Sequence, residues 1–181
     1  KSPLYPVHEK LIKANKIHGV EVFNYMEYYP VAFDWCRDNG LAFMANTDMH
    51  GLVNIDYGAK NKIRPMTLVL AKERTIESIK EALFAKRSIA YFNGELAGKQ
   101  EHLKGLLKAS LKIRIINDKY AEVTNISDIT YRVIGGGNSY IFPAQKTILM
   151  AVPGYDTIFT VENCHTGSNE KLTVTVSDFD F

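Results

Sequence analysis

The first 110 residues alternate between helical and strand-like hydrophobic patterns. Apolar residues recur at helical spacing in 7–16 and in 31–39, and Gly40 is a typical stop signal for the second helix. A short apolar run follows each segment, at 20–24 and at 41–45, and such runs are typical of buried strands. The order helix, strand, helix, strand predicts parallel strands connected by crossover helices.

The alternation continues after a polar, turn-rich loop at 51–65. A strand is predicted at 66–71, and a further helix is predicted to begin after Thr75, whose hydroxyl can cap it. A strand at 88–92 and a helix at 100–109 complete this part of the chain. The helix after Thr75 is expected to bury one apolar stripe, made of Ile76, Ile79, Ala82, Leu83 and Phe84.

From Leu111 the hydrophobic pattern changes to a period of two. Short apolar stretches alternate with turn residues such as those at 135–138 and 153–154, which predicts an antiparallel sandwich. The sequence therefore predicts two domains, an α/β layer in residues 1–110 and an all-β sandwich in residues 111–181. The second pattern resembles the immunoglobulin-like modules that are attached to many extracytoplasmic enzymes.

Candidate chemistry lies directly after the buried run at 41–45. Asp48 and His50 stand two positions apart and are followed by Gly51, which lets the backbone turn. On an extended backbone, side chains at i and i+2 point the same way, so the two groups can converge on one cation or one phosphate. A carboxylate together with an imidazole suits zinc, manganese or iron. Asp48 and His50 are therefore the candidate metal ligands.

The motifs around this site resemble the C-terminal third of the PHP (polymerase and histidinol phosphatase) family. The resemblance covers about residues 17–98 and rests on their order: "HGVEVFN", then "AxTDxHG", "TLVLAKERTIESIKEAL" and "AKRSIAYFNG". It implies a partial, distorted β/α barrel and a metal-dependent phosphoesterase, in which Asp48 and His50 bind divalent ions that activate water. Glu21 and Asn24, at the end of the neighbouring strand, are expected to position other groups rather than bind metal.

The chain departs from the family pattern in one respect that changes the interpretation. Family members open with a His-x-His motif and carry further glutamate and histidine ligands, whereas this sequence has no His-x-His and only five histidines. The resemblance therefore implies the C-terminal part of a longer protein, with the N-terminal barrel strands absent and the remaining ligands before Lys1. That missing segment is then an expected partner of this chain.

The loop at 51–65 carries three basic residues, Lys60, Lys62 and Arg64. In a barrel of this kind, the loop would lie at the carboxyl ends of the strands, where active sites form. Arg64 is the best candidate to bind a small phosphorylated substrate, because a guanidinium group can bind a phosphate through two hydrogen bonds. The alternative is an ordinary solvated loop.

Composition narrows the possible functions. The 181 residues are 46% hydrophobic and 23% charged, and the formal net charge of +2 gives no strong signal for nucleic-acid binding. The longest apolar runs have about five residues, far fewer than the roughly 18 of a membrane span. Cys36 and Cys164 lie in different halves and are expected to be buried thiols rather than a disulfide. The compartment stays open.

Three functions remain from the sequence. The first is a PHP-like phosphoesterase, of which this chain is a fragment that is inactive alone. The second is a non-catalytic binding or assembly module that works through the sandwich. The third is a PHP-fold hydrolase that acts on C–N bonds. In each case the absent strands are expected to leave 20–24 or its neighbour as an exposed sheet edge, which favours pairing with another chain.

Overall fold

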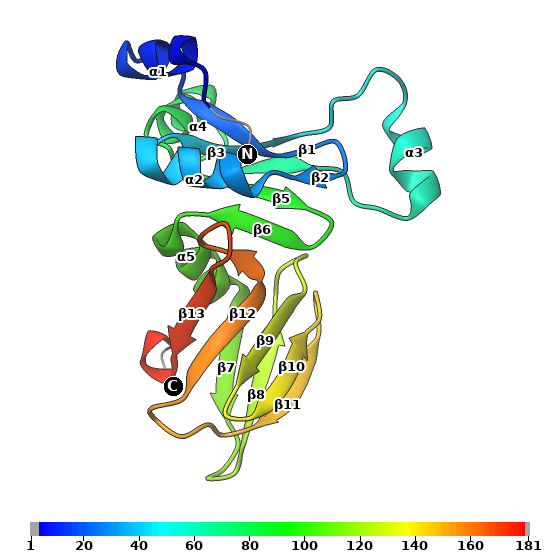
Figure 1. Cartoon of the computed structure of the whole chain (residues 1–181). Coiled ribbons are helices and arrows are strands. Elements are labelled where there is room, and N and C mark those ends of the chain that lie inside the picture. The colour runs from blue at the N-terminus through cyan, green and yellow to red at the C-terminus, as the bar shows by residue number, and fades with distance from the viewer. Residues whose placement is uncertain (1–3, 180–181) are drawn as a thin grey trace.

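The computed structural model describes residues 4–179, which form mostly β-sheet with few helices (Figure 1). The helical segments are α1 (Pro6–Lys13), α2 (Pro30–Asn39), α3 (Val53–Asp56), α4 (Ile76–Phe84) and α5 (Gln100–Ser110), with 3-10 turns η1 (Gly58–Lys60) and η2 (Val176–Asp178). The strands are β1 (Gly19–Asn24), β2 (Glu27–Tyr28), β3 (Ala42–Asn46), β4 (Met66–Val69), β5 (Ser88–Phe92), β6 (Glu95–Gly98), β7 (Leu111–Ile115), β8 (Tyr120–Asn125), β9 (Tyr131–Gly135), β10 (Asn138–Phe142), β11 (Thr147–Ala151), β12 (Ile158–His165) and β13 (Lys171–Thr175).

Local sequence signals explain where the helices begin and end. Pro30 lies in the first turn of α2, where its missing N–H removes no helical hydrogen bond. The helix ends at Gly40, which takes a left-handed conformation with φ of 60°. Thr75 caps α4 as predicted, because its hydroxyl accepts the Ser78 N–H at 3.2 Å. None of the described helices has the length and hydrophobicity that crossing a membrane requires.

The prediction of parallel strands holds only for the first pair. β1 and β3 are parallel neighbours with α2 between them, whereas β4, β5 and β6 are antiparallel. The β5–β6 pairing follows from Asn93 and Gly94, which both have positive φ and form a two-residue hairpin turn. That turn forces β6 to return beside β5. Within residues 4–179 the strands form open sheets and no closed barrel.

A single sheet runs from the first part of the chain into the second. Its strand order is β10-β9-β12-β6-β5-β4, with β13 also paired to β12. The link is a short parallel pairing between β12 and β6, in which Cys164 lies opposite Leu96. The remaining sandwich strands form a second sheet in the order β11-β8-β7. The change of periodicity at Leu111 coincides with the start of β7, directly after α5.

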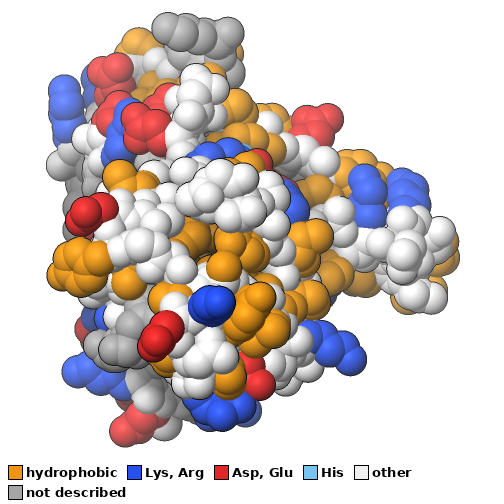
Figure 2. All heavy atoms as spheres, turned by 90° about the horizontal axis from the view of Figure 1, so that it is seen from below, with side chains coloured by type: hydrophobic (Ala, Val, Ile, Leu, Met, Phe, Trp, Pro, Cys, Tyr) orange, Lys and Arg blue, Asp and Glu red, His pale blue; other side chains and the backbone are white. Residues whose placement is uncertain are grey.

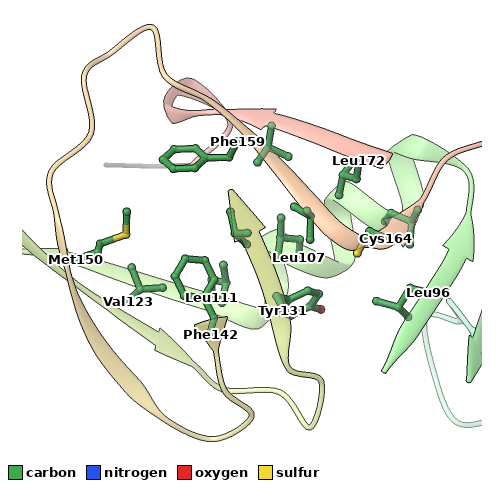
Figure 3. Packing of buried hydrophobic residues seen from close by; sticks show 14 of the residues in the cluster. Leu96, Leu107, Leu111, Val123, Tyr131, Phe142, Met150, Phe159, Cys164 and Leu172 are labelled. Atoms are coloured by element: carbon green, nitrogen blue, oxygen red, sulfur yellow. The ribbon is translucent and has the colours of Figure 1, made fainter. Parts of the chain in front are cut away.

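Two hydrophobic cores lie on opposite sides of the β5–β6 hairpin. Because successive strand residues face opposite ways, Ile89 and Leu96 enter one core while Ala90 and Ala97 enter the other. The first core fills the sandwich. Figure 3 shows that Leu96 of β6 and Leu107 of α5 belong to the same buried cluster as Tyr131 of β9. The second core joins the hairpin to β1, β3 and α2.

The predicted apolar stripe of α4 is wrong. Ala82 is fully buried, but Ile76 is 80% exposed and Phe84 is 55% exposed. The spacing is helical, yet no described layer covers the outer side of this helix, so periodicity alone overestimated its burial. By contrast, both cysteines are free and buried, as predicted.

The first sheet has a partly open edge. β2 pairs only with Phe23 and Asn24 at the end of β1. Within the described residues, the stretch of β1 from Gly19 to Glu21 has no neighbouring strand on that side. A hollow of about 330 Å³ lies beside it, between β1 and α2, lined by residues that include Glu21, Asn24 and Trp35.

Candidate functional site

Asp48 and His50 lie on the segment that leaves the carboxyl end of β3. Phe43 and Ala45 anchor this strand in the core, and the chain emerges to solvent at Asn46. The expectation of an extended backbone is wrong for Asp48, whose φ of 50° is left-handed. Aspartate tolerates this conformation better than most residues because its short side chain can bond locally. Both candidate ligands are exposed.

A main-chain contact orients the His50 ring. His50 Nδ1 lies 2.8 Å from the carbonyl oxygen of Asp48. Since a carbonyl oxygen only accepts hydrogen bonds, Nδ1 must carry the proton. The neutral ring then presents the lone pair of Nε2, which is the form in which histidine binds a metal. The turn at Asp48 thus leaves Nε2 of His50 available as one nitrogen donor.

Glu21 is held by two amides at the ends of the parallel strands. Its Oε2 accepts from Asn24 Nδ2 at 2.5 Å and its Oε1 accepts from Asn46 Nδ2 at 2.6 Å. Asn24 and Asn46 are paired across β1 and β3, so both reach the same carboxylate. Sequence reasoning selected Glu21 and Asn24 but missed Asn46. Its position at the end of a buried run, like that of Asn24, was the available signal.

Tyrosines surround these carboxylates. Tyr29 Oη donates to Glu27 at 2.7 Å, and this bond raises the pKa of Tyr29, with smaller contributions from burial and from the negative charges of Glu27, Asp48 and Glu21. Tyr57, which is 1% exposed, donates to the Thr47 carbonyl at 2.9 Å and so ties the loop to the segment that carries Asp48. The pKa of Tyr57 is also raised, and burial is the main cause. The negative charges of Glu27, Asp48 and Glu21 therefore all act on the Tyr29 hydroxyl.

The described residues stop short of a complete metal site. Among residues 4–179 no group of three or more histidine, cysteine, aspartate or glutamate side chains is arranged to hold a metal ion. Asp48 and His50 share one turn, while the oxygens of Glu21 are both engaged by amides. Asp48 and His50 therefore remain as two side chains whose chemistry suits a divalent cation.

The basic loop projects from the body of the molecule. Figure 1 shows α3 and the flanking chain extending to one side, and Figure 2 shows basic and apolar side chains together on this projection. Lys60 Nζ lies 5.7 Å from the centre of the Tyr25 ring, so the loop contacts the turn after β1. Arg64 is exposed and forms no ion pair with another described residue. Its role in binding phosphate stays a prediction.

Comparison with known proteins gives one informative similarity. No family model and no curated protein matches the chain. The crystal structure of a two-domain protein from Bacteroides vulgatus ATCC 8482, which contains a predicted PHP-like metal-dependent phosphoesterase, matches with a TM-score of 0.88 and 27% sequence identity. The match covers 97% of this chain and 57% of the other, so the chain spans a little over half the length of that protein.

Proposed function

We propose that this chain is part of a PHP-like metal-dependent phosphoesterase that hydrolyses a small phosphate ester with metal-activated water. The proposal extends to the fold: the first 110 residues as part of a distorted β/α barrel, and residues 111–181 as an immunoglobulin-like sandwich. Two independent findings support it. The similarity to the Bacteroides protein extends over nearly the whole chain, and the Asp-x-His turn after β3 carries an exposed carboxylate and an imidazole whose Nδ1 bonds to the Asp48 carbonyl.

The observation that carries the proposal is the hydrogen bond between His50 Nδ1 and the Asp48 carbonyl. It fixes the proton on Nδ1 and leaves Nε2 free as a donor. Asp48, two residues earlier, supplies an exposed carboxylate, and a neutral imidazole with a carboxylate suits manganese, zinc or iron. The two side chains fit a divalent ion as part of its ligand set.

A bound divalent ion would lower the pKa of its water ligand and would stabilise negative charge on the phosphoryl oxygens. The residues of this chain would then have separate tasks. Asp48 and His50 would hold the ion, while the amides of Asn24 and Asn46 keep the Glu21 carboxylate fixed at the ends of β1 and β3. Arg64 would bind the phosphate through its guanidinium group.

Two donors are too few for turnover. A catalytic zinc ordinarily takes three protein ligands and a water, and a cluster needs more. We propose that chain preceding Lys1 supplies the remaining ligands, and that it covers the open side of β1 next to the 330 Å³ hollow. The Bacteroides protein is longer than this chain, which supports the existence of further residues beyond these 181.

Manganese titration of the 181-residue chain tests the ligand assignment without requiring activity. Paramagnetic Mn²⁺ is expected to broaden the NMR signals of residues 46–51 first, with weak affinity because only two donors are present. His50→Ala should remove this selective broadening. His8→Ala, which removes a histidine on α1, should leave it unchanged. Broadening that spreads evenly over surface carboxylates, or that survives His50→Ala, would refute the assignment.

A further inference from the structure

β4 ends the seven-stranded sheet with an unpaired edge. The N–H of Leu70, just beyond β4, donates to the Arg87 carbonyl at 3.0 Å, which continues the antiparallel ladder with β5. In such a ladder only alternate residues bond to the partner strand. The N–H and C=O groups of Thr67 and Val69 therefore point away from β5. No described strand forms a backbone ladder with that edge, and β3 reaches β4 only through the Thr67 hydroxyl, which accepts from the Ala45 N–H at 2.9 Å and donates to the Ala45 carbonyl at 3.1 Å. Unpaired groups of this kind are a template for another strand.

A hollow of about 630 Å³ follows this edge. Its walls come from β4, from Tyr91 on β5, from α5 and from the loop after β8. Among the described residues that line it, Asp128 alone is charged. An added strand would place alternate side chains into an apolar surface, which is how strand addition gains specificity. The apolar lining consists of Ile63, Met66, Leu68, Leu70, Leu106 and Ile129.

The ends of the edge are basic. Lys72 and Arg74 follow β4, and Lys62 and Arg64 precede it. None of the four forms an ion pair with another residue in the described part of the chain. Glu73 and Asp128, together with Glu81, on which the charge of Lys72 acts, offset part of this charge. A partner with acidic ends therefore fits better than a neutral or basic one.

The same charges argue against a second copy of the chain. If two β4 edges paired antiparallel about Leu68, Arg64 of each copy would lie opposite Lys72 of the other. Like charges directly opposite each other destabilise a strand pair. The edge thus disfavours its own copy while it remains open to an acidic strand.

We propose that the edge of β4 binds an extended peptide segment of another protein by strand addition, with apolar residues at alternate positions and acidic residues at both ends. Backbone hydrogen bonds to Thr67 and Val69 align the segment. Its apolar side chains fill the hollow between β4, α5 and Ile129. Lys72 and its basic neighbours hold the acidic ends, so binding weakens as salt increases.

Fluorescence anisotropy with two labelled nine-residue peptides tests the proposal. Both have the core Val-Ser-Val-Ser-Val, and one has two acidic residues at each end while the other has two lysines. The acidic peptide is expected to bind at least about tenfold more tightly, a difference of about 1.4 kcal/mol. Lys72→Glu should remove this preference, whereas Lys108→Glu on the exposed side of α5 should keep it. Equal binding of the two peptides would overturn the proposal.

A backbone variant separates strand addition from simple charge attraction. Proline is tolerated on an edge strand where the N–H faces outward. Val69→Pro should therefore abolish peptide binding while the circular dichroism spectrum stays that of the wild type. In the wild type, hydrogen exchange at the Val69 amide should slow when the acidic peptide is added. If the exchange rate of the Val69 amide does not change when the peptide is added, the proposal is contradicted. It is also contradicted if a longer form of the protein already protects this amide from exchange in the absence of peptide.

Discussion

At the residue scale, the junction between the two cores depends on a small polar network. Buried Asn163 donates to the carbonyls of Gly94 and Thr130 at 2.7 and 2.9 Å, which ties β12 to the β5–β6 hairpin. Beside it, Glu95 accepts from His165 at 2.9 Å and from Arg132 at 2.5 Å. Because these groups come from strands far apart in the sequence, the network fixes how the two parts of the chain meet.

The network predicts an acid-sensitive stability. The hydrogen bond from His165, together with Arg132, lowers the pKa of Glu95 from 4.5 to about 2. A carboxyl whose pKa is lower in the folded state stabilises the fold above its unfolded pKa, and that contribution is lost as the pH falls. Stability should therefore decrease as the pH falls from about 4.5 to about 2.

Urea unfolding at several pH values measures this effect. Glu95→Gln should be less stable than the wild type at neutral pH, and the difference should shrink across the acidic range. A direct NMR titration of the Glu95 carboxyl should give a pKa near 2. A difference between the two proteins that is independent of pH would show that the charge of Glu95 contributes nothing.

At the element scale, two glycines should respond oppositely to alanine. A Cβ on Gly135 in β9 would collide with the Phe159 ring and lie 2.9 Å from the Ile158 carbonyl oxygen, so Gly135→Ala should destabilise the sandwich by about 1–3 kcal/mol. Gly105 in α5 has open space around its Cβ position, so Gly105→Ala should stabilise that helix by up to about 1 kcal/mol. Thermal unfolding of both variants checks the signs, and equal shifts would contradict the packing described for β9.

The elements also show what periodicity can and cannot predict. Caps and breakers such as Thr75 and Gly40 gave the helix ends correctly because they act locally. The pairing of β6 with β5 was missed because the Asn93-Gly94 hairpin signal was overlooked. The exposure of Ile76 was missed because burial depends on which layer covers a helix, and the pattern of one helix does not contain that information.

In the candidate site, too, local features could be predicted from the sequence and tertiary contacts could not. The sequence singled out Asp48 and His50 as candidate ligands from their residue types, but the left-handed turn that aims His50 Nδ1 at the Asp48 carbonyl lies outside any period-two argument. Asn46 was missed because its contact with Glu21 joins two strands. Spacing along one strand carries no direct information about such a contact.

At the scale of the whole molecule, the two proposed domains share a core. Leu103 and Leu107 of α5 pack with the sandwich strands, and β6 pairs with β12. A fragment of residues 111–181 should therefore be much less stable than a fragment of residues 86–181, which keeps β5, β6 and α5. Urea midpoints of the two fragments test this. Equal midpoints would show that the sandwich needs nothing from the earlier residues.

The proposed function also predicts that the 181-residue chain is catalytically silent. Its two exposed donors can hold a metal loosely, but fixing an ion for hydrolysis takes at least about three protein ligands. Assays with p-nitrophenyl phosphate and manganese or zinc should show no turnover by this chain. Activity should appear when the preceding segment is supplied covalently or in trans. Robust turnover by the isolated chain, abolished by His50→Ala, would place the other ligands within these 181 residues.

The most direct test of the central claim is the amount of manganese bound per chain in the longer protein, compared between wild type, Asp48→Ala and His50→Ala. If both side chains are ligands, each variant should lose bound metal, and hydrolysis should fall with it. Arg64→Ala should keep the metal and weaken binding of the anionic substrate. Unchanged metal content in both Asp48→Ala and His50→Ala would contradict the claim that this turn is part of a metal centre.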